Sequence, residues 1–153
     1  MKSIRLPASL AVILSVSLSA AALQDQNEQG QTVTYLPADQ VAQALENSGL
    51  LVSEPDLTVL GAHRSAGAGQ PEAHVKVTDI YYVVAGEATL VTGGRLEGSR
   101  ESRPGEFLGG ELIGGTERQV RQGDVVVIPP GIPHWYKEVP NEISYYLVKV
   151  IRP

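Results

Sequence analysis

The chain has 153 residues, a formal net charge of −5 and no cysteine. Without cysteine the protein has no disulfide, no thiolate nucleophile and no thiolate metal ligand, so any bound metal must be held by His, Asp or Glu. The acidic balance argues against nucleic acid or an anionic membrane surface as a partner, because both attract concentrated positive charge.

Residues 1–22 have the pattern of a secretory signal peptide. Lys2 and Arg5 precede a short apolar stretch, and a run of small residues ends at Ala22. We expect cleavage near Ala22, export to the periplasm or beyond the cell, and no membrane attachment of the mature protein.

The remainder of the chain divides into a leader and one domain. The polar residues 23–35 predict a flexible leader, and residues 36–153 have the size of a single domain with one core. Pro37 and the stop sequence Asn47-Ser48-Gly49 predict a short helix at the start of this domain.

From Leu50 onward, short β-rich segments alternate with glycine, proline and acidic turns. The predicted strands are Leu50–Ser53, Leu57–Arg64, Glu72–Val77, Ile80–Val84, Ala88–Thr92, Phe107–Leu112, Glu117–Arg121, Val125–Ile128, His134–Val139 and Ser144–Ile151. The polar stretch from Glu97 to Glu106 predicts a solvent-exposed excursion between strands. Many short strands after one helix predict an all-β sandwich or small barrel.

Three pairs of neighbouring aromatic residues lie on predicted strands. They are Tyr81-Tyr82, Trp135-Tyr136 and Tyr145-Tyr146. Because successive side chains of a strand point to opposite faces, we expect one ring of each tyrosine pair to face the interior. One of Trp135 and Tyr136 is expected to form the wall of a pocket, and the other to pack in the sheet.

The stretch from Gly123 to His134 combines a turn, a strand and a rigid corner. Gly123-Asp124 forms the turn, and the β-branched run Val125–Ile128 predicts a buried strand. Pro129-Pro130-Gly131 ends that strand, because proline cannot donate a ladder hydrogen bond. His134 follows the corner directly, and a rigid corner suits a side chain that must be held in one place.

A second polar group surrounds His74. Glu72 and His74 are two residues apart, so on a strand they face the same side, and Asp79 follows at the head of the next apolar run. If His134 converges on them, two imidazoles and two carboxylates form a site for Fe, Mn, Ni, Cu or Zn with an open coordination position.

The stretch from Gly123 to His134 resembles the second sequence motif of the cupin family. Five residues separate Gly123 from Pro129-Pro130-Gly131, and two more precede His134. The asparagine that often closes the motif is Glu138 here.

The stretch from Glu72 to Gly86 is similar to the first cupin motif in an altered form. Four residues separate His74 from Asp79, and six separate Asp79 from Gly86. The resemblance makes His74 the second motif histidine, Asp79 the counterpart of the motif glutamate, and Glu72 the counterpart of the first histidine. It implies that Glu72, His74, Asp79 and His134 hold the metal.

The resemblance also implies the architecture. It covers about residues 57–151 and indicates a cupin-type double-stranded β-helix, a jelly-roll barrel, with the short helix packed outside it. Similar cupins are often homodimers that pair through outer strands, so a homodimer is expected.

Two functions are consistent with the sequence. The first is a metal-dependent enzyme of oxygenase, isomerase or lyase type, acting on a small organic molecule, with Tyr82, Lys76 or His63 handling protons. The second is a non-catalytic cupin that binds a small sugar or organic acid without a metal, the motifs surviving as strand and turn architecture.

Overall fold

The computed structural model describes residues 30–152. The predicted signal peptide over residues 1–22 lies outside the described residues, as does most of the predicted leader over 23–35. The chain divides into two units, and the second, which begins at Tyr35, carries the fold. Within residues 30–152, no helix is long and apolar enough to cross a membrane.

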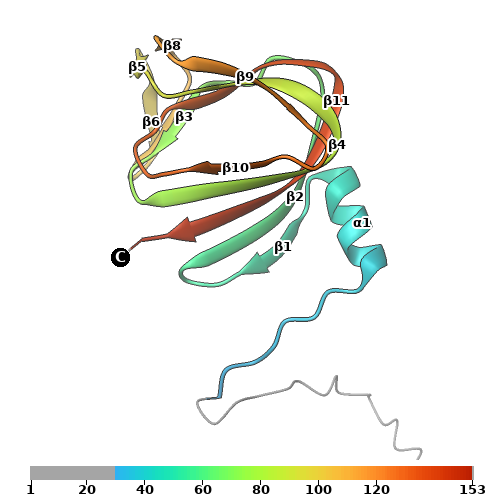
Figure 1. Ribbon diagram of the computed structural model, residues 1–153. Helices are drawn as coiled ribbons and strands as arrows, with labels where there is room; N and C mark the ends of the chain where they lie inside the picture. The colour runs from blue at the N-terminus through green and yellow to red at the C-terminus, as the bar shows by residue number, and fades with distance from the viewer. Residues whose placement is uncertain (1–29, 153) are drawn as a thin grey trace, which may run out of the picture. The chain divides into compact units, whose positions relative to one another are not determined.

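The second unit is one helix followed by strands that curl into a barrel (Figure 1). The elements are α1 (Ala38–Asn47), β1 (Leu50–Ser53), β2 (Leu57–Gly67), β3 (Glu72–His74), β4 (Val77–Thr92), β5 (Arg95–Glu97), β6 (Arg100–Arg103), β7 (Glu106–Leu108), β8 (Glu111–Ile113), β9 (Thr116–Arg121), β10 (Val125–Ile128) and β11 (His134–Ile151). Nine strands form one sheet, and β5 pairs with β8 in a separate sheet at one end of the barrel. The all-β prediction is confirmed.

The long strands β4 and β11 hold the barrel together. β11 pairs with β2, β3 and β4, and β4 also pairs with β9 and β10. The sequence predicted each long strand as two, whereas the structure joins the halves through register shifts. Gly86 lies at such a bend in β4, with φ +77°, and a Cβ there would lie 2.0 Å from the Glu142 carbonyl oxygen. Only glycine fits that approach.

The core is formed by the inward faces of these strands. Tyr81 is 2 % exposed and its neighbour Tyr82 is 46 % exposed, so the predicted alternation of the tyrosine pairs is confirmed here. The buried cluster consists of Tyr81, Val83, Ala88, Leu90, Val120, Ile128, Tyr136, Val139, Ile143 and Tyr145. Apolar burial of this kind stabilises the fold without disulfides.

Strand β10 differs from its prediction as a fully buried strand. Ile128 is buried, but Val125 is 62 % exposed and Val127 is 57 % exposed. The reason is that β10 pairs only with β4, so one of its faces is directed inward and the other outward. Val125 lies opposite the exposed Tyr82 in this pairing, which gives the barrel an apolar outer face.

Helix α1 has the predicted limits and packs against β2. It follows Pro37 and ends at Ser48, whose φ of 56° is left-handed. A Cβ at Gly61 would lie 2.5 Å from the Ala44 carbonyl carbon, so glycine lets the helix approach the strand closely.

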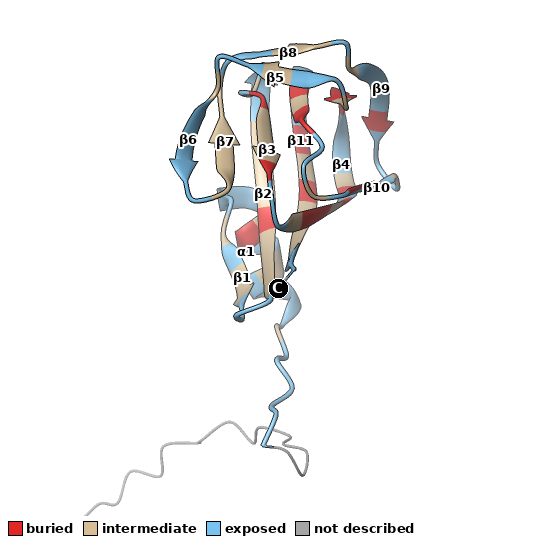
Figure 2. Ribbon diagram, turned by 90° about the vertical axis from the view of Figure 1, so that its left-hand side faces the viewer, coloured by how far each residue is buried: buried red, intermediate tan, exposed pale blue. Residues whose placement is uncertain are grey.

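The predicted polar excursion over residues 97–106 contains strand structure. β6 pairs with β7 in a hairpin that turns at Pro104-Gly105, and β6 is exposed along its whole length (Figure 2). The missing apolar alternation is the reason that the sequence did not show this strand. The predicted strand Phe107–Leu112 is likewise divided, at Gly109-Gly110, into β7 and β8.

Candidate metal centre

Glu72, His74 and His134 form a group whose ligand atoms all lie within 4.8 Å of one another. Strand pairing produces the group, because β11 places His134 directly opposite Glu72 of β3. His74 lies two residues further along β3 and therefore faces the same side. The His134 Nε2 atom is 3.4 Å from Glu72 Oε1, and His74 Nε2 is 3.8 Å from Glu72 Oε2.

The orientation of His134 suits a metal ligand. Its Nδ1 lies 3.0 Å from the Ile132 carbonyl oxygen. Since a carbonyl only accepts, Nδ1 carries the proton and donates to it. His134 Nε2 is buried, faces the group and has no aligned hydrogen-bond partner in the described part of the chain. Buried polar atoms without a partner are uncommon, and this nitrogen is placed as metal-binding imidazoles are, so the residues fit a metal ion.

Asp79 adjoins the group but is engaged by a lysine. Its side chain is 1 % exposed, and Oδ2 lies 3.3 Å from the Nε2 atoms of both His74 and His134. Its Oδ1 accepts a hydrogen bond of 3.0 Å from Lys149 Nζ. Lys149 Nζ is also 3.2 Å from His74 Nε2. The structure thus brings together all four predicted ligands, with three in the metal group and the fourth, Asp79, in an ion pair.

The sequence did not single out Lys149, although a signal was present. Lys149 lies opposite Asp79 in the pairing of β11 with β4. It shares the face of Tyr145 and Leu147 on β11, which are directed toward the core. A lysine in an inward apolar row indicates a buried acidic partner, and this pattern was readable from the last strand.

The charges at the site are strongly coupled. Burial alone would raise the pKa of Asp79, but contacts with His134 and His74 and the charge of Lys149 outweigh it and hold that pKa well below its usual range. Burial also opposes ionisation of Glu72, and His134 and His74 lower its pKa in the same way. Burial disfavours the imidazolium of His134, but Asp79 and Glu72 raise its pKa to about 9. Without a metal, the site is an internal ion-pair network.

Glu106 of β7 stands behind His74. Its Oε2 lies 2.5 Å from His74 Nδ1, an ion-pair contact whose alignment is not that of a hydrogen bond. The register of β3 and β7 places the two residues opposite each other. A carboxylate at the far nitrogen of a metal-binding imidazole orients the ring, which is the role this position offers.

A wall of tyrosines closes the inner side of the site. The Tyr81 ring meets His134 edge-on at 6.2 Å between centroids, and it stacks on Tyr136 at 5.8 Å. Arg64 Nε donates to Tyr145 Oη at 3.2 Å. Burial raises the pKa of Tyr81 well above its ordinary value, so its phenol stays protonated.

The residues predicted to handle protons are not brought to the group. Tyr82 lies on the outer face, stacked with Tyr146 at 6.4 Å. Lys76 is exposed between β3 and β4. His63 Nδ1 lies 3.1 Å from Ser144 Oγ, on the face of β2 opposite to the inward Ala62. Strand alternation is the physical reason, because the side chains of Tyr82 and His63 point to the outer faces of their strands. Lys76 lies outside both β3 and β4.

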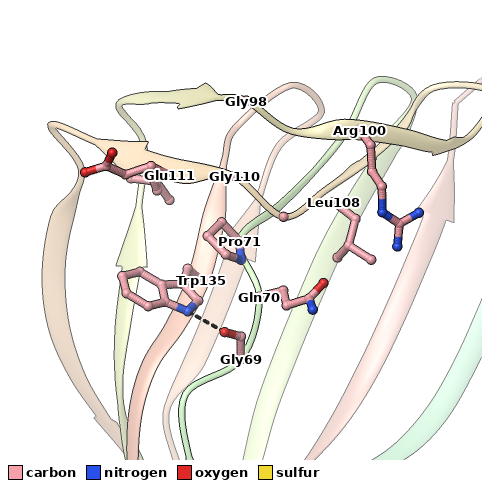
Figure 3. Close-up of a pocket in the computed structure, with 11 residues that line it drawn as sticks. Gly69, Gln70, Pro71, Gly98, Arg100, Leu108, Gly110, Glu111 and Trp135 are labelled. Carbon is pink, nitrogen blue, oxygen red and sulfur yellow. Dashed lines mark hydrogen bonds between the residues drawn. The ribbon is translucent and has the colours of Figure 1, made fainter.

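A cavity of about 670 Å³ lies at the β5–β8 end of the barrel (Figure 3). The metal group does not line it, but the chain neighbours Pro71 and Trp135 do. Trp135 Nε1 donates to the Gly69 carbonyl at 2.9 Å, so the ring is held in the wall, as was expected for one of the pair Trp135-Tyr136. Arg100 is on the other side of the cavity (Figure 3), and its guanidinium has no side-chain partner among residues 30–152.

One register row connects the cavity to the metal group. His134 lies opposite Glu72, Glu72 opposite Leu108, and Leu108 opposite Arg100. Since neighbouring strands are about 4.8 Å apart, Arg100 lies about 10 Å from Glu72 along this row.

A curled antiparallel barrel with two histidines and a carboxylate gathered on facing strands defines a β-barrel protein with a candidate mononuclear metal centre. The cupin family model matches residues 56–149, and the chain belongs to the cupin family. The predicted resemblance and the double-stranded β-helix are thereby confirmed.

Solved structures are similar to this chain at low sequence identity. The Fe(II) form of HppE is 14 % identical with a TM-score of 0.50, over 67 % of this chain and 49 % of that one. An uncharacterised double-stranded β-helix protein from Klebsiella pneumoniae is 15 % identical with a TM-score of 0.49, over 68 % and 70 %. KdgF from Halomonas sp. is 20 % identical with a TM-score of 0.46, over 69 % and 79 %. The chain spans about half the length of HppE, and no curated protein matches it.

Proposed function

We propose that this cupin binds one divalent metal ion through Glu72, His74 and His134 and acts as an enzyme on a small organic molecule. The observation that carries the proposal is the buried His134 Nε2, which faces a second imidazole and a carboxylate and has no aligned hydrogen-bond partner in the described residues. Two histidines and one carboxylate with open positions are the ligand set of non-haem Fe(II) oxygenases.

The donor set defines a group of suitable metals and does not single out one of them. One carboxylate and two imidazoles suit Fe, Mn or Zn, and Ni and Cu also accept imidazole. The Fe(II) form of HppE, a fold relative, is consistent with iron. When bound, the metal supplies Lewis acidity or activation of O2, which serves oxygenase, isomerase or lyase chemistry.

The protein's own residues supply positioning and exclusion of water. Glu106 orients His74, the Ile132 carbonyl orients His134, and the tyrosine wall around Tyr81 closes the inner side. Lys149 has its ammonium closest to the ligand atoms. It therefore takes over the proton-handling role that the sequence had suggested for Lys76.

The cavity favours a small organic acid as the molecule that binds. Leu108, Leu112 and Trp135 give it apolar walls. The guanidinium of Arg100, which has no side-chain partner between residues 30 and 152, offers a forked donor that matches a carboxylate. A single tryptophan provides little stacking surface, so a sugar is the less favoured ligand.

A metal-free binding cupin is the second candidate, and Lys149 is the observation that favours it. Its ammonium already neutralises Asp79 and lies 3.2 Å from His74 Nε2, close to where a metal would bind. In that case the cluster is a structural ion network, and the cavity alone binds the ligand.

Metal analysis after reconstitution separates the two candidates. The purified protein is stripped with chelator, incubated separately with Fe(II), Mn(II), Ni(II) and Zn(II), desalted and assayed by elemental analysis, beside His134→Ala and the control His63→Ala. The enzyme proposal expects about one equivalent of one metal in wild type and His63→Ala and little in His134→Ala. Wild type that retains none of the metals contradicts it.

Two further properties are proposed. The apolar outer face formed by Val125, Val127 and Tyr82 supports a homodimer. Light scattering of wild type and Val127→Glu tests it, with a dimer and a monomer as the expected results. Export is proposed from the predicted signal peptide, and mass spectrometry of the N-terminus of protein from the exported fraction tests it.

A further inference from the structure

We propose that Lys149 is a built-in cation of the metal site that competes with the metal for Asp79 and weakens the site's affinity for divalent metal ions. The inference rests on the proposed metal site at Glu72, His74 and His134. It assigns a specific role to a residue that neither the motifs nor the family match singles out.

Close contacts with a carboxylate and an imidazole define the position of Lys149. Its Nζ lies 3.0 Å from Asp79 Oδ1 and 3.3 Å from Oδ2, so the ammonium spans the whole carboxylate. Nζ is also 3.2 Å from His74 Nε2, the atom that would bind the metal, and Asp79 Oδ2 lies 3.3 Å from that same nitrogen. The ammonium therefore contacts both a ligand atom and the carboxylate that the resemblance had made a fourth ligand, at the place where a metal would approach them.

The backbone holds this arrangement in place. Lys149 and Asp79 are directly opposite each other in the pairing of β11 with β4, so the pair does not depend on a flexible loop. Asp79 is 1 % exposed, whereas the Lys149 side chain is 25 % exposed. The carboxylate is thus fixed in the core, and the ammonium reaches it from the more open side.

Charge explains the effect on metal binding. A divalent ion bound to His74 Nε2 would lie close to the ammonium, and like charges at such a distance repel strongly in a partly buried site. The same ammonium satisfies Asp79, which would otherwise be an uncompensated buried anion available to the metal. Removal of the ammonium eliminates the repulsion and frees a carboxylate ligand, and both changes strengthen metal binding.

A purely structural role for Lys149 predicts a different result. In that case the lysine only neutralises buried Asp79, and its loss lowers the stability while leaving the affinity for metal unchanged or reduced. The sign of the change in metal affinity therefore distinguishes the two roles.

The test is calorimetric titration of Zn²⁺ into metal-free full-chain protein, comparing wild type, Lys149→Met and Lys137→Met. Lys137 is the matched control, since it is on the same strand, is exposed and pairs with Glu117 away from the site. We expect Lys149→Met to bind Zn²⁺ at least tenfold more tightly than wild type and Lys137→Met to bind as wild type. An affinity of Lys149→Met equal to or below that of wild type overturns the inference.

A double variant keeps the test decisive if Lys149→Met does not fold. Lys149→Met with Asp79→Asn removes both charges of the buried pair, so no unpaired charge remains. It should bind Zn²⁺ more tightly than Asp79→Asn, which lacks the same carboxylate but keeps the ammonium. Binding no tighter than that of Asp79→Asn overturns the inference.

The outcomes separate this inference from the proposed function. Wild-type protein that binds no metal contradicts the proposed enzyme, but a Lys149→Met variant that then binds Zn²⁺ still supports the role of Lys149. Wild-type protein that binds metal, with Lys149→Met no tighter, leaves the enzyme proposal standing and removes the role of Lys149.

Discussion

Raising the pH should destabilise the metal-free protein through His134. The two carboxylates beside it raise the pKa of His134 from 6.5 to about 9, although burial opposes this. A raised pKa in the folded state means that the stabilisation is complete below pH 6.5 and is lost as the pH rises through about 9. The shift corresponds to on the order of 3 kcal/mol of unfolding free energy.

The assay is urea unfolding of chelator-treated protein at several pH values between 6 and 10. We expect the unfolding free energy of wild type to fall by about 2 to 3 kcal/mol over this range. His134→Ala should show little of that loss, whereas His63→Ala, which changes a histidine away from the cluster, should keep it. A wild-type stability that stays constant from pH 6.5 to pH 10 would refute the assignment of His134 as the protonated partner of Glu72 and Asp79.

Further expectations concern the cavity and the packing. Arg100→Ala should weaken binding of small carboxylic acids about tenfold or more in calorimetric titration. Arg95→Ala is the control and should bind them as wild type does, because the Arg95 guanidinium pairs with Glu97 outside the cavity. Equal affinities of the two variants would contradict the role of Arg100. Gly61→Ala should lower the unfolding free energy by about 2 kcal/mol in urea titrations, because helix α1 must move away from β2, and an unchanged stability would contradict that close contact. Tyr136→Phe should leave stability within about 0.5 kcal/mol of wild type, because its buried hydroxyl makes no well-aligned hydrogen bond within residues 30–152. Tyr145→Phe should cost about 1 kcal/mol by removing the acceptor of Arg64, and the reverse order would contradict the hydrogen-bond assignment.

The second motif explains why the fold was predictable from the sequence. Proline fixes φ and glycine permits the positive φ of a tight turn, so their spacing before His134 determines a strand, a corner and a directed side chain without knowledge of distant contacts. Helix α1 was predictable for the same reason, since Pro37 and Ser48 act locally at its ends. Strand limits were less predictable, because β4 and β11 continue through bends that long-range pairing supports.

The candidate site was predictable only in part. Glu72, His74, Asp79 and His134 do converge, since parity on β3 and the corner before β11 are properties of the local sequence. The ion pair of Asp79 with Lys149 depends on the register between β4 and β11, seventy residues apart, which no local pattern specifies.

The exposure of strand β10 likewise could not be predicted from the local sequence. The run Val125–Ile128 is apolar on both faces, and such a run is typical of a strand covered on both sides. Its position at the edge of the sheet, paired only with β4, leaves Val125 and Val127 exposed. Composition shows that a strand is apolar, but only the tertiary arrangement, or a second copy of the chain, determines what covers it.

The most direct test of the metal centre is anomalous diffraction from crystals of protein reconstituted with the metal that it retains. We expect one anomalous peak, bonded to Glu72, His74 Nε2 and His134 Nε2, with Asp79 still paired to Lys149. A reconstituted crystal without a peak among these three side chains, or with the metal bound elsewhere on the barrel, would contradict it.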